Sequence, residues 1–430
     1  MDHRTRPRAV RAVAAFVFSA LALSPALVAC GSDEAAAPDS IDVVTRWSAG
    51  NSAAAAQNRV FEAFTAETGI KVNVTEGLET IDDQVENAVA AGKSPDLVIV
   101  NLFDKTLGWL DAGVTVPADQ YLKDWGLADK IKPAALNEWR AGDKLQGLPF
   151  SGFSWPLWYN TDLLKKAGVD KIPATTDELI AAAGKLRAAG VAPLAVGGND
   201  WTGQKFFYQI AQSYTDAKAM QGVMQKGGYC ATPSVLEGIK LFTQLRDAGV
   251  FVDNAAGLNA DNMYASYYGG KAAIMPAGSW AYTESTASGT GIDKHTTLGG
   301  FPIPSGATFK KPTAFRGFTG VGFMITKRGA EKDRIDNLRK LVTKFYADTA
   351  VGDFVKDSGI LPPTTGDFAT YATNPLLSQS LGLDATVDYA VLPDVWIGSA
   401  SDRIIQVLTG AYGKSTPQQI CAGLDTATKG

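Results

Sequence analysis

The side chains that most often carry catalysis or hold a metal ion are scarce in this sequence. Its 430 residues include two histidines and three cysteines. Zinc sites and Cys–His or Ser–His–Asp catalytic groups need several such residues together. The motifs HExxH, CxxC, GxSxG and GxxxxGK[ST] are absent, and Gly269-Gly270-Lys271 lacks the spacing of a phosphate-binding loop. We therefore expect no metal ion, no cofactor and no histidine- or cysteine-based catalysis.

Carboxylates are the remaining group for acid–base catalysis, which glycosidases perform with a pair of them. The chain has 44 aspartates and glutamates, and no spacing singles out one pair. The histidine His295 lies in the Gly- and Thr-rich stretch TGIDKHTTLGG, which predicts a loop. The sequence therefore gives catalysis no support, although a carboxylate pair stays open as an alternative.

Several of the nine tryptophans lie among small or polar neighbours. They are Trp201 after Gly198-Asn199-Asp200, Trp280 after Ala277-Gly278-Ser279, and Trp396 after Pro393-Asp394-Val395. A flat apolar ring beside polar side chains suits a sugar, because a sugar has a C–H face and a rim of hydroxyls. The alternative for each is a core tryptophan with a satisfied N–H, and we assign Trp109, Trp125 and Trp139 to the core outright.

The amino terminus has the pattern of an export signal. Arginines up to Arg11 precede an apolar run over 12–28, which is short and broken by Pro25. The run ends in Leu27-Val28-Ala29-Cys30, which resembles the bacterial lipobox. That resemblance implies cleavage after residue 29 and a diacylglyceryl group on Cys30; a plain signal peptide is the alternative. We expect residues 30–40 to be the acylated cysteine and a flexible tether, and the lipid to be the only membrane anchor.

Loss of that basic leader makes the mature chain more acidic, which argues against a nucleic-acid partner. Two cysteines remain apart from the proposed anchor, Cys230 and Cys421. Cysteines of an exported chain can form a disulfide, but the sequence leaves open whether these two meet.

The apolar patterns after residue 40 predict strands alternating with helices. A strand over 41–47, a helix over 53–68, a strand over 70–74, a helix around 81–89 and a strand over 97–100 follow in order. This order predicts a sheet covered by helices. The loops at 48–51 and 101–105 would then lie beside one crevice, where such sheets bind ligands. Further helices are expected from 176, from 234 and around 335–345, the first of them opened by the capping box Thr175-Thr176-Asp177-Glu178.

Six phrases in a fixed order give the mature chain a family resemblance. They are Ser94–Val98, Leu110–Val114, Gly147–Pro149, Leu157–Gly168, Gly270–Trp280 and Phe301–Pro304. In these phrases the chain resembles the sugar-binding, maltose-binding-protein-like solute-binding proteins that feed ABC importers. The resemblance implies an α/β, two-lobed periplasmic-binding-protein type II fold with interleaved lobes. It implies lobes of 41–150 plus 303–358 and of 151–302 plus 359–430, with hinge crossovers near 150–157, 298–304 and 359–363.

The same resemblance implies ligand-binding positions where the local motif aligns. They are Asn51, Asn101, Asp104, Lys105, Phe153, Trp155, Asp200, Trp201, Trp280, Arg316 and Trp396. Two departures count against maltose itself. The acidic residue of the maltose binder's hinge strand is replaced by Phe153 or its neighbours, and the arginine after its last tryptophan is displaced to Arg403.

We therefore expect a monomeric, lipid-anchored protein on the outer face of the cytoplasmic membrane. It would bind a mono- or oligosaccharide between its lobes and deliver it to the transmembrane subunits of an ABC permease. One alternative is an exported carbohydrate-active enzyme that uses a carboxylate pair. Another is a binder of a non-sugar solute, for which Tyr264, Tyr267 and Tyr268 suggest iron, although they fit more simply as one face of a helix.

Overall fold

The computed structural model describes residues 39–77 and 80–429. The expected signal peptide, the acylated Cys30 and the tether up to residue 38 lie outside the described residues. Within the described ranges, no helix is long and apolar enough to cross a membrane.

The first sheet is built by the segments at the start of the chain. Its parallel strands are β1 (Ser40–Thr45), β2 (Lys71–Glu76) and β3 (Leu97–Val100), with β1 in the middle. The helices α1 (Ser52–Thr68) and α2 (Ile81–Ala90) alternate with them, so the predicted strand–helix order is confirmed. Three later strands complete the sheet, and two of them are β11 (Thr313–Ile325), antiparallel to β3, and the short β12 (Asp388–Tyr389) beside β11. The strand β6 (Leu148–Trp155) pairs antiparallel with β11, on the side of β11 opposite β3.

Local sequence explains the ends of α1. Its amino terminus is capped by Asn51, whose side chain accepts a hydrogen bond from the Ala53 N–H at 2.8 Å. Its carboxyl terminus is Gly69, with φ of 73°, a left-handed conformation that glycine adopts without strain. The predicted apolar stripe through Val60 and Phe64 is buried. Because β1 and β3 are parallel, their carboxyl ends place the loops at 48–51 and 101–105 on one edge of the sheet.

The second sheet has the order β10-β7-β9-β8. Its strands are β7 (Leu157–Asn160), β8 (Ala192–Leu194), β9 (Ala272–Pro276) and β10 (Thr296–Gly299). The helices that belong to this part of the chain are α5 (Thr161–Lys166), α6 (Thr176–Ala188), α7 (Trp201–Ala211), α8 (Ala217–Lys226), α9 (Pro233–Asp247), α10 (Ala260–Tyr268) and α11 (Ala281–Ala287). The predicted capping box is present, because the Thr175 side chain accepts from the Glu178 N–H while the Glu178 carboxylate accepts from the Thr175 N–H.

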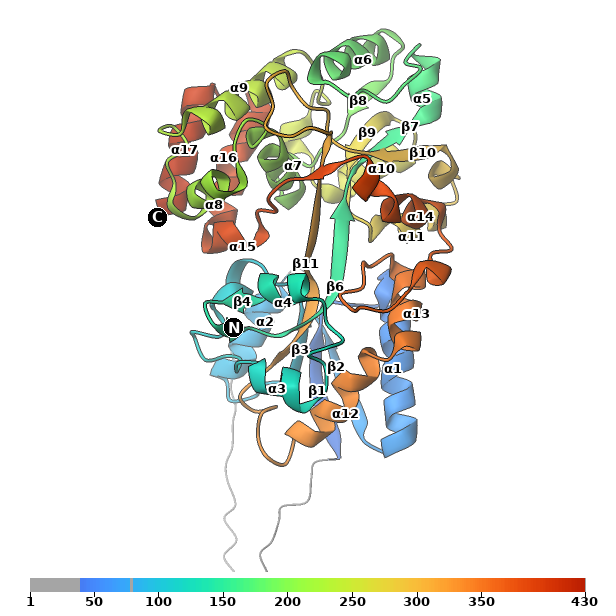
Figure 1. Cartoon of the computed structure of the whole chain (residues 1–430), viewed down its shortest axis with the longest axis vertical. Coiled ribbons are helices and arrows are strands. Elements are labelled where there is room, and N and C mark those ends of the chain that lie inside the picture. The colour runs from blue at the N-terminus through green and yellow to red at the C-terminus, as the bar shows by residue number, and fades with distance from the viewer. Residues whose placement is uncertain (1–38, 78–79, 430) are drawn as a thin grey trace, which may run out of the picture. The chain divides into compact units, whose positions relative to one another are not determined.

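The strands β6 and β11 run side by side in antiparallel pairing, and the chain changes sheet at their ends (Figure 1). The strand β6 ends at Trp155 and β7 begins at Leu157, so only Pro156 separates a strand of the first sheet from one of the second. Residues 300–312 lead from β10 to β11. After α13 (Asp348–Ser358), Leu361 pairs with Gly152 of β6. These connections overlap the three stretches predicted as crossovers, and their role as hinges, like the lobe boundaries, remains a prediction.

The remaining elements cover the two sheets or connect them. They are α3 (Asp119–Asp124), α4 (Pro133–Glu138), β4 (Arg140–Ala141), β5 (Lys144–Leu145), α12 (Ile335–Phe345), α13 (Asp348–Ser358), α14 (Pro375–Leu381), α15 (Asp394–Ile397), α16 (Ser401–Gly413) and α17 (Pro417–Lys429). A 3-10 turn at Asp104–Gly108 follows β3, and another at Ile292–His295 contains His295.

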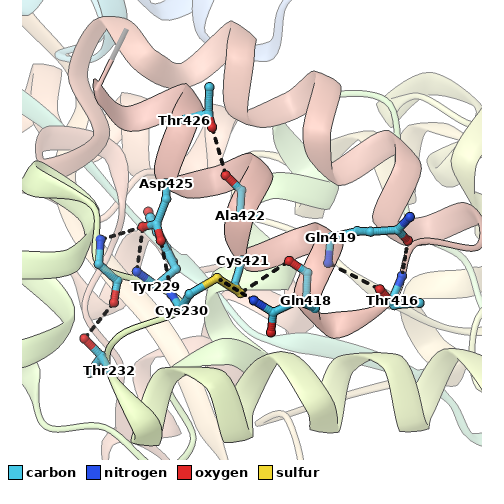
Figure 2. The surroundings of a disulfide bond; sticks show 11 residues. Tyr229, Cys230, Thr232, Thr416, Gln418, Gln419, Cys421, Ala422, Asp425 and Thr426 are labelled. Atoms are coloured by element: carbon cyan, nitrogen blue, oxygen red, sulfur yellow. Dashed lines mark hydrogen bonds between the residues drawn. A yellow bond between two sulfur atoms is a disulfide. The ribbon is translucent and has the colours of Figure 1, made fainter.

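A disulfide joins the last helix to the segment between α8 and α9, as Figure 2 shows. It pairs Cys230 with Cys421, the pairing that the sequence left open. Beside it, the Asp425 carboxylate accepts hydrogen bonds from the backbone N–H groups of Tyr229 at 2.7 Å and Cys230 at 3.3 Å, and from that of Gly228. The disulfide and the carboxylate therefore fix α17 to the same turn.

Candidate ligand-binding site

A group of aromatic side chains gathers where the β6–β11 pair meets the start of α7. We call it the aromatic cluster; it contains Phe153, Trp155, Trp201, Trp280, Phe309 and Phe315, with Ala390 and Leu392 against them. The Trp155 ring centroid lies 5.3 Å from that of Trp201 and 5.5 Å from that of Trp280, and Phe153 lies 5.3 Å from Trp280. Four of the predicted binding residues, drawn from three separate segments of the chain, are thus in mutual contact.

The secondary structure explains this meeting. Residues 153 and 155 are two apart on β6, so their side chains lie on the same face of the strand. The residue opposite Trp155 on β11 is Phe315, which extends the apolar surface across the pair. The remaining rings come from segments that end at this face: Trp201 is the first residue of α7, and Trp280 follows β9 in a turn.

The indole of Trp280 is held on two sides. Its Nε1–H donates to the hydroxyl of Tyr264 at 3.2 Å. Its ring lies against Gly278 so closely that a Cβ added to that glycine would stand 2.2 Å from the nearest ring carbon. The orientation of Trp280 is therefore set by a hydrogen bond and by the absence of a side chain at position 278.

Trp155 differs from other buried tryptophans in its hydrogen bonding. Its side chain is 0% exposed, and its Nε1–H has no partner among the described residues. The indole N–H groups of Trp139 and Trp158, by contrast, donate to backbone carbonyls at 2.7 and 3.1 Å. A buried donor without an acceptor is costly, so an acceptor oxygen from a ligand would stabilise Trp155.

Charged groups lie beside the aromatic cluster. Lys205, one turn after Trp201 on α7, forms an ion pair with Asp394 at the start of α15. The other oxygen of Asp394 accepts from the Thr319 hydroxyl at 3.0 Å. The Lys205 ammonium also lies 5.6 Å from the centroid of the Phe153 ring, within the range of a cation–π interaction.

A second carboxyl group lies close by, on α4. The Glu138 side chain accepts a hydrogen bond from the backbone N–H of Phe318. Burial raises the pKa of Glu138 to about 7, and the charge of Asp394 acts in the same direction, while the hydrogen bond from Phe318 opposes both. Glu138 therefore titrates near neutral pH.

Comparison with known proteins places this geometry in a family. Residues 49–352 match the model of the bacterial extracellular solute-binding proteins. The chain belongs to that family. A solved structure described as a probable secreted solute-binding lipoprotein from Streptomyces coelicolor is 34% identical over 91% of this chain and 99% of its own, with a TM-score of 0.80.

Two further proteins resemble this chain, one in structure and one in sequence. A solved chitin oligosaccharide binding protein is 23% identical, covers 91% of this chain and 98% of its own, and superposes with a TM-score of 0.80. A probable sugar-binding periplasmic protein of Rhizobium meliloti (strain 1021) is 29% identical over 58% of this chain and 60% of its own length. The α/β, two-lobed fold predicted from the resemblance is confirmed.

Three further predicted residues of this solute-binding protein have partners outside the aromatic cluster. Asn51 caps α1, and Lys105 pairs with the exposed Asp83, which raises the pKa of Lys105. Arg316 pairs with Asp384 at 2.7 Å, and its guanidinium lies 4.5 Å from the centre of the Tyr389 ring. These contacts give all three side chains partners within the protein. The part of these residues in ligand binding remains a prediction.

Asp200 has a structural position in the described fold. Its carboxylate accepts from the Thr202 N–H at 2.9 Å and the Thr202 hydroxyl at 2.6 Å, and from the Ala260 N–H. It therefore caps α7 and fixes the start of the helix at Trp201. Burial raises the pKa of Asp200, with those hydrogen bonds acting against it.

The last three predicted positions differ in what is described. The Asn101 side-chain oxygen is buried without a hydrogen-bond partner among the described residues, just after β3. Trp396 is half-buried and packs against the main core, outside the aromatic cluster. Asp104 begins the turn after β3, but its side chain lies outside the description. As predicted, Trp109 and Trp139 belong to the core; Trp125 is half-buried and lies 5.1 Å from the Tyr121 ring.

Sequence reasoning missed Lys205, Glu138 and the part played by Asp394. Lys205 and Glu138 sit in helices with no local motif, and their partners lie far along the chain. Asp394, however, stands in the polar stretch before Trp396 that the sequence had singled out. A surface hollow of about 610 Å³ lies elsewhere, lined by residues such as Arg187, Asp253 and Lys271, and contains none of the predicted residues.

Proposed function

We propose that this solute-binding protein captures a mono- or oligosaccharide at the aromatic cluster and delivers it to the permease of an ABC transporter. The observation that carries the proposal is the cluster itself, in which Trp280 is held in a fixed orientation beside the unpartnered N–H of Trp155. Printed descriptions of relatives, including the sugar-binding protein of Rhizobium meliloti and the chitin oligosaccharide binding protein, point the same way.

The physical requirement for such binding is modest. A micromolar dissociation constant corresponds to about −8 kcal/mol. Stacking of sugar C–H faces on Trp280 or Trp201, and a hydroxyl oxygen that accepts from Trp155, would supply area and direction together. Asn101 would add an acceptor for a sugar hydroxyl through its unpartnered side-chain oxygen.

The finer arrangement is also part of the proposal. Residues 41–150 and 303–358 would form one lobe and residues 151–302 and 359–430 the other, closing by hinge motion around the crossovers. The place of β11 in the first sheet and of β7 and β10 in the second supports this division. Cys30 would carry the lipid that anchors a monomer to the outer face of the cytoplasmic membrane.

The test is calorimetric titration of the mature protein with a broad panel of mono- and oligosaccharides. We expect at least one to bind, and the Trp280→Ala variant to lose affinity strongly while remaining folded. The matched control is Trp125→Ala, which removes a half-buried tryptophan from α3's end and should bind as the wild type does. No response to any sugar, or equal affinity in the Trp280 variant, would refute the proposal.

The alternative that the protein is a carbohydrate-active enzyme is tested with the same ligand. Family members are binding proteins, and we propose that this chain likewise returns its ligand unchanged. Prolonged incubation followed by chromatography of the sugar should recover it intact. Accumulation of a shorter or modified sugar would instead favour catalysis by a carboxylate pair.

A further inference from the structure

The ion pair between Lys205 and Asp394 is almost sealed from solvent beside the aromatic cluster. The two residues are 8% and 9% exposed. Taking both charges out of water is expensive, and the cost is recovered only when each charge keeps its counter-charge and further hydrogen bonds. Thr319 supplies one such hydrogen bond to Asp394, and the face of Phe153 lies against the ammonium of Lys205.

This pair still has hydrogen-bonding capacity. An ammonium has three N–H donors, and among the described residues Asp394 is the one hydrogen-bond acceptor found for that of Lys205. A carboxylate has about four acceptor positions, of which Lys205 and Thr319 take two in Asp394. Both groups can therefore bind the hydroxyls of an uncharged molecule without separating from each other.

A charged ligand, by contrast, would disrupt the ion pair between Lys205 and Asp394. A cation would compete with Lys205 both for Asp394 and for the Phe153 ring, and would leave two positive charges around one carboxylate. An anion would draw Lys205 away and leave Asp394 buried without its partner. Burial raises the pKa of the nearby Glu138, and the negative charge of Asp394 adds to that rise, so a further negative charge is disfavoured there as well.

We propose that Lys205 and Asp394 form the polar side of the ligand site and restrict it to uncharged sugars. This inference rests on the proposed function and adds the charge class of the ligand. Lys205 supplies the positive charge of the site, and Asp394 supplies the negative charge that balances it. Amino sugars and uronic acids with the same ring should therefore bind much more weakly than the neutral parent.

The experiment is calorimetry at pH 6 with matched series: glucose, glucosamine and glucuronate; galactose, galactosamine and galacturonate; and N,N′-diacetylchitobiose with its de-N-acetylated dimer. In every series that binds to the wild type, we expect the neutral member to bind at least about tenfold more tightly than its charged counterparts. A charged member that binds as tightly as the neutral parent would overturn the inference. If no member of any series nor of the broader sugar panel binds, the proposed function itself fails.

Two variants reverse the charge preference in opposite directions. Lys205→Met leaves Asp394 without a counter-ion, so the amino sugar should gain at least about tenfold relative to the neutral parent. Asp394→Asn should produce the corresponding gain for the uronate. The double variant removes both charges and should show neither gain, and Lys344→Met, which breaks an exposed ion pair with Glu67, is the matched control.

An unchanged preference in the folded single variants would contradict the assignment even if neutral sugars bind well. If a single variant fails to fold, as judged by circular dichroism, the double variant and the wild-type series still decide. A double variant that keeps the wild-type discrimination against charged sugars would show that another group imposes it.

Discussion

The contact between Gly278 and the Trp280 ring leads to a sharp prediction, because one methyl group should disable the site without removing any binding residue. A Cβ at position 278 would lie 2.2, 2.3 and 2.6 Å from three carbons of the indole. Carbon atoms prefer separations of about 3.5–4.0 Å, so the ring would have to move by more than about 1 Å. Gly278 does not have a positive φ, so alanine introduces no backbone strain there.

Overpacking of this kind costs about 1–3 kcal/mol. If the ring moves away to relieve the contact, the penalty falls on ligand binding, and we expect Gly278→Ala to weaken sugar affinity by roughly 5- to 150-fold. The melting temperature should change little in that case. The assay is calorimetric titration with a sugar that binds to the wild type, together with thermal unfolding of the free protein.

A double-mutant cycle identifies the cause. In a Trp280→Ala background the new methyl group meets no ring, so Gly278→Ala should cause no further loss of affinity. Gly184→Ala in α6 is the control, since a Cβ there meets nothing within 4 Å. Wild-type affinity in Gly278→Ala, or equal losses in both backgrounds, would refute the reasoning.

Three further predictions concern stability. Because burial raises the pKa of Glu138 to about 7, the folded state binds its proton more tightly than the unfolded state, and the free energy of unfolding should fall by up to about 3 kcal/mol as pH rises from about 4.5 to 7. Glu138→Gln should flatten this fall in a series of denaturant titrations at different pH. The same pH dependence in the variant and the wild type would contradict the prediction. Replacing both Cys230 and Cys421 by serine opens a link across 191 residues and should cost about 2–5 kcal/mol in urea unfolding; an unaltered midpoint would argue against the bridge. Asp200→Ala removes the cap of α7 and should cost about 1 kcal/mol, with Asp200→Asn restoring most of it; loss of sugar affinity in Asp200→Asn at full stability would instead make Asp200 a ligand contact.

The sequence predicted the parts of the fold that depend on local patterns. Continuous apolar runs such as Leu97–Val100 became central strands, and the stop at Gly69 and the capping box at Thr175 are where the residues required them. The crossover at Pro156 was also readable, since proline disfavours helix in the residue before it.

The site was only partly predictable. Phe153, Trp155, Trp201 and Trp280 each lie in a recognisable local phrase, and the structure brings these four candidates into contact, while their part in binding stays a prediction. Asp200 shows what the sequence did not reveal: its carboxylate caps α7 through hydrogen bonds from Thr202 and Ala260, and its part in binding stays a prediction.

The charged groups of the proposed site could not be predicted from the sequence. Lys205 and Asp394 are 189 positions apart, and only the ion pair that the fold forms between α7 and α15 reveals them as partners. The raised pKa of Glu138 likewise depends on burial and on the nearby Asp394, which no local pattern encodes. The pairing of Cys230 with Cys421 required the same long-range information.

The most direct test of sugar capture at the aromatic cluster is a crystal structure of the mature protein with the tightest-binding sugar of the panel. We predict a sugar ring stacked on Trp280, with an oxygen atom accepting a hydrogen bond from the Trp155 N–H and hydroxyls within reach of Lys205 and Asp394. A sugar bound away from these residues, for example in the surface hollow beside Arg187, would contradict the account.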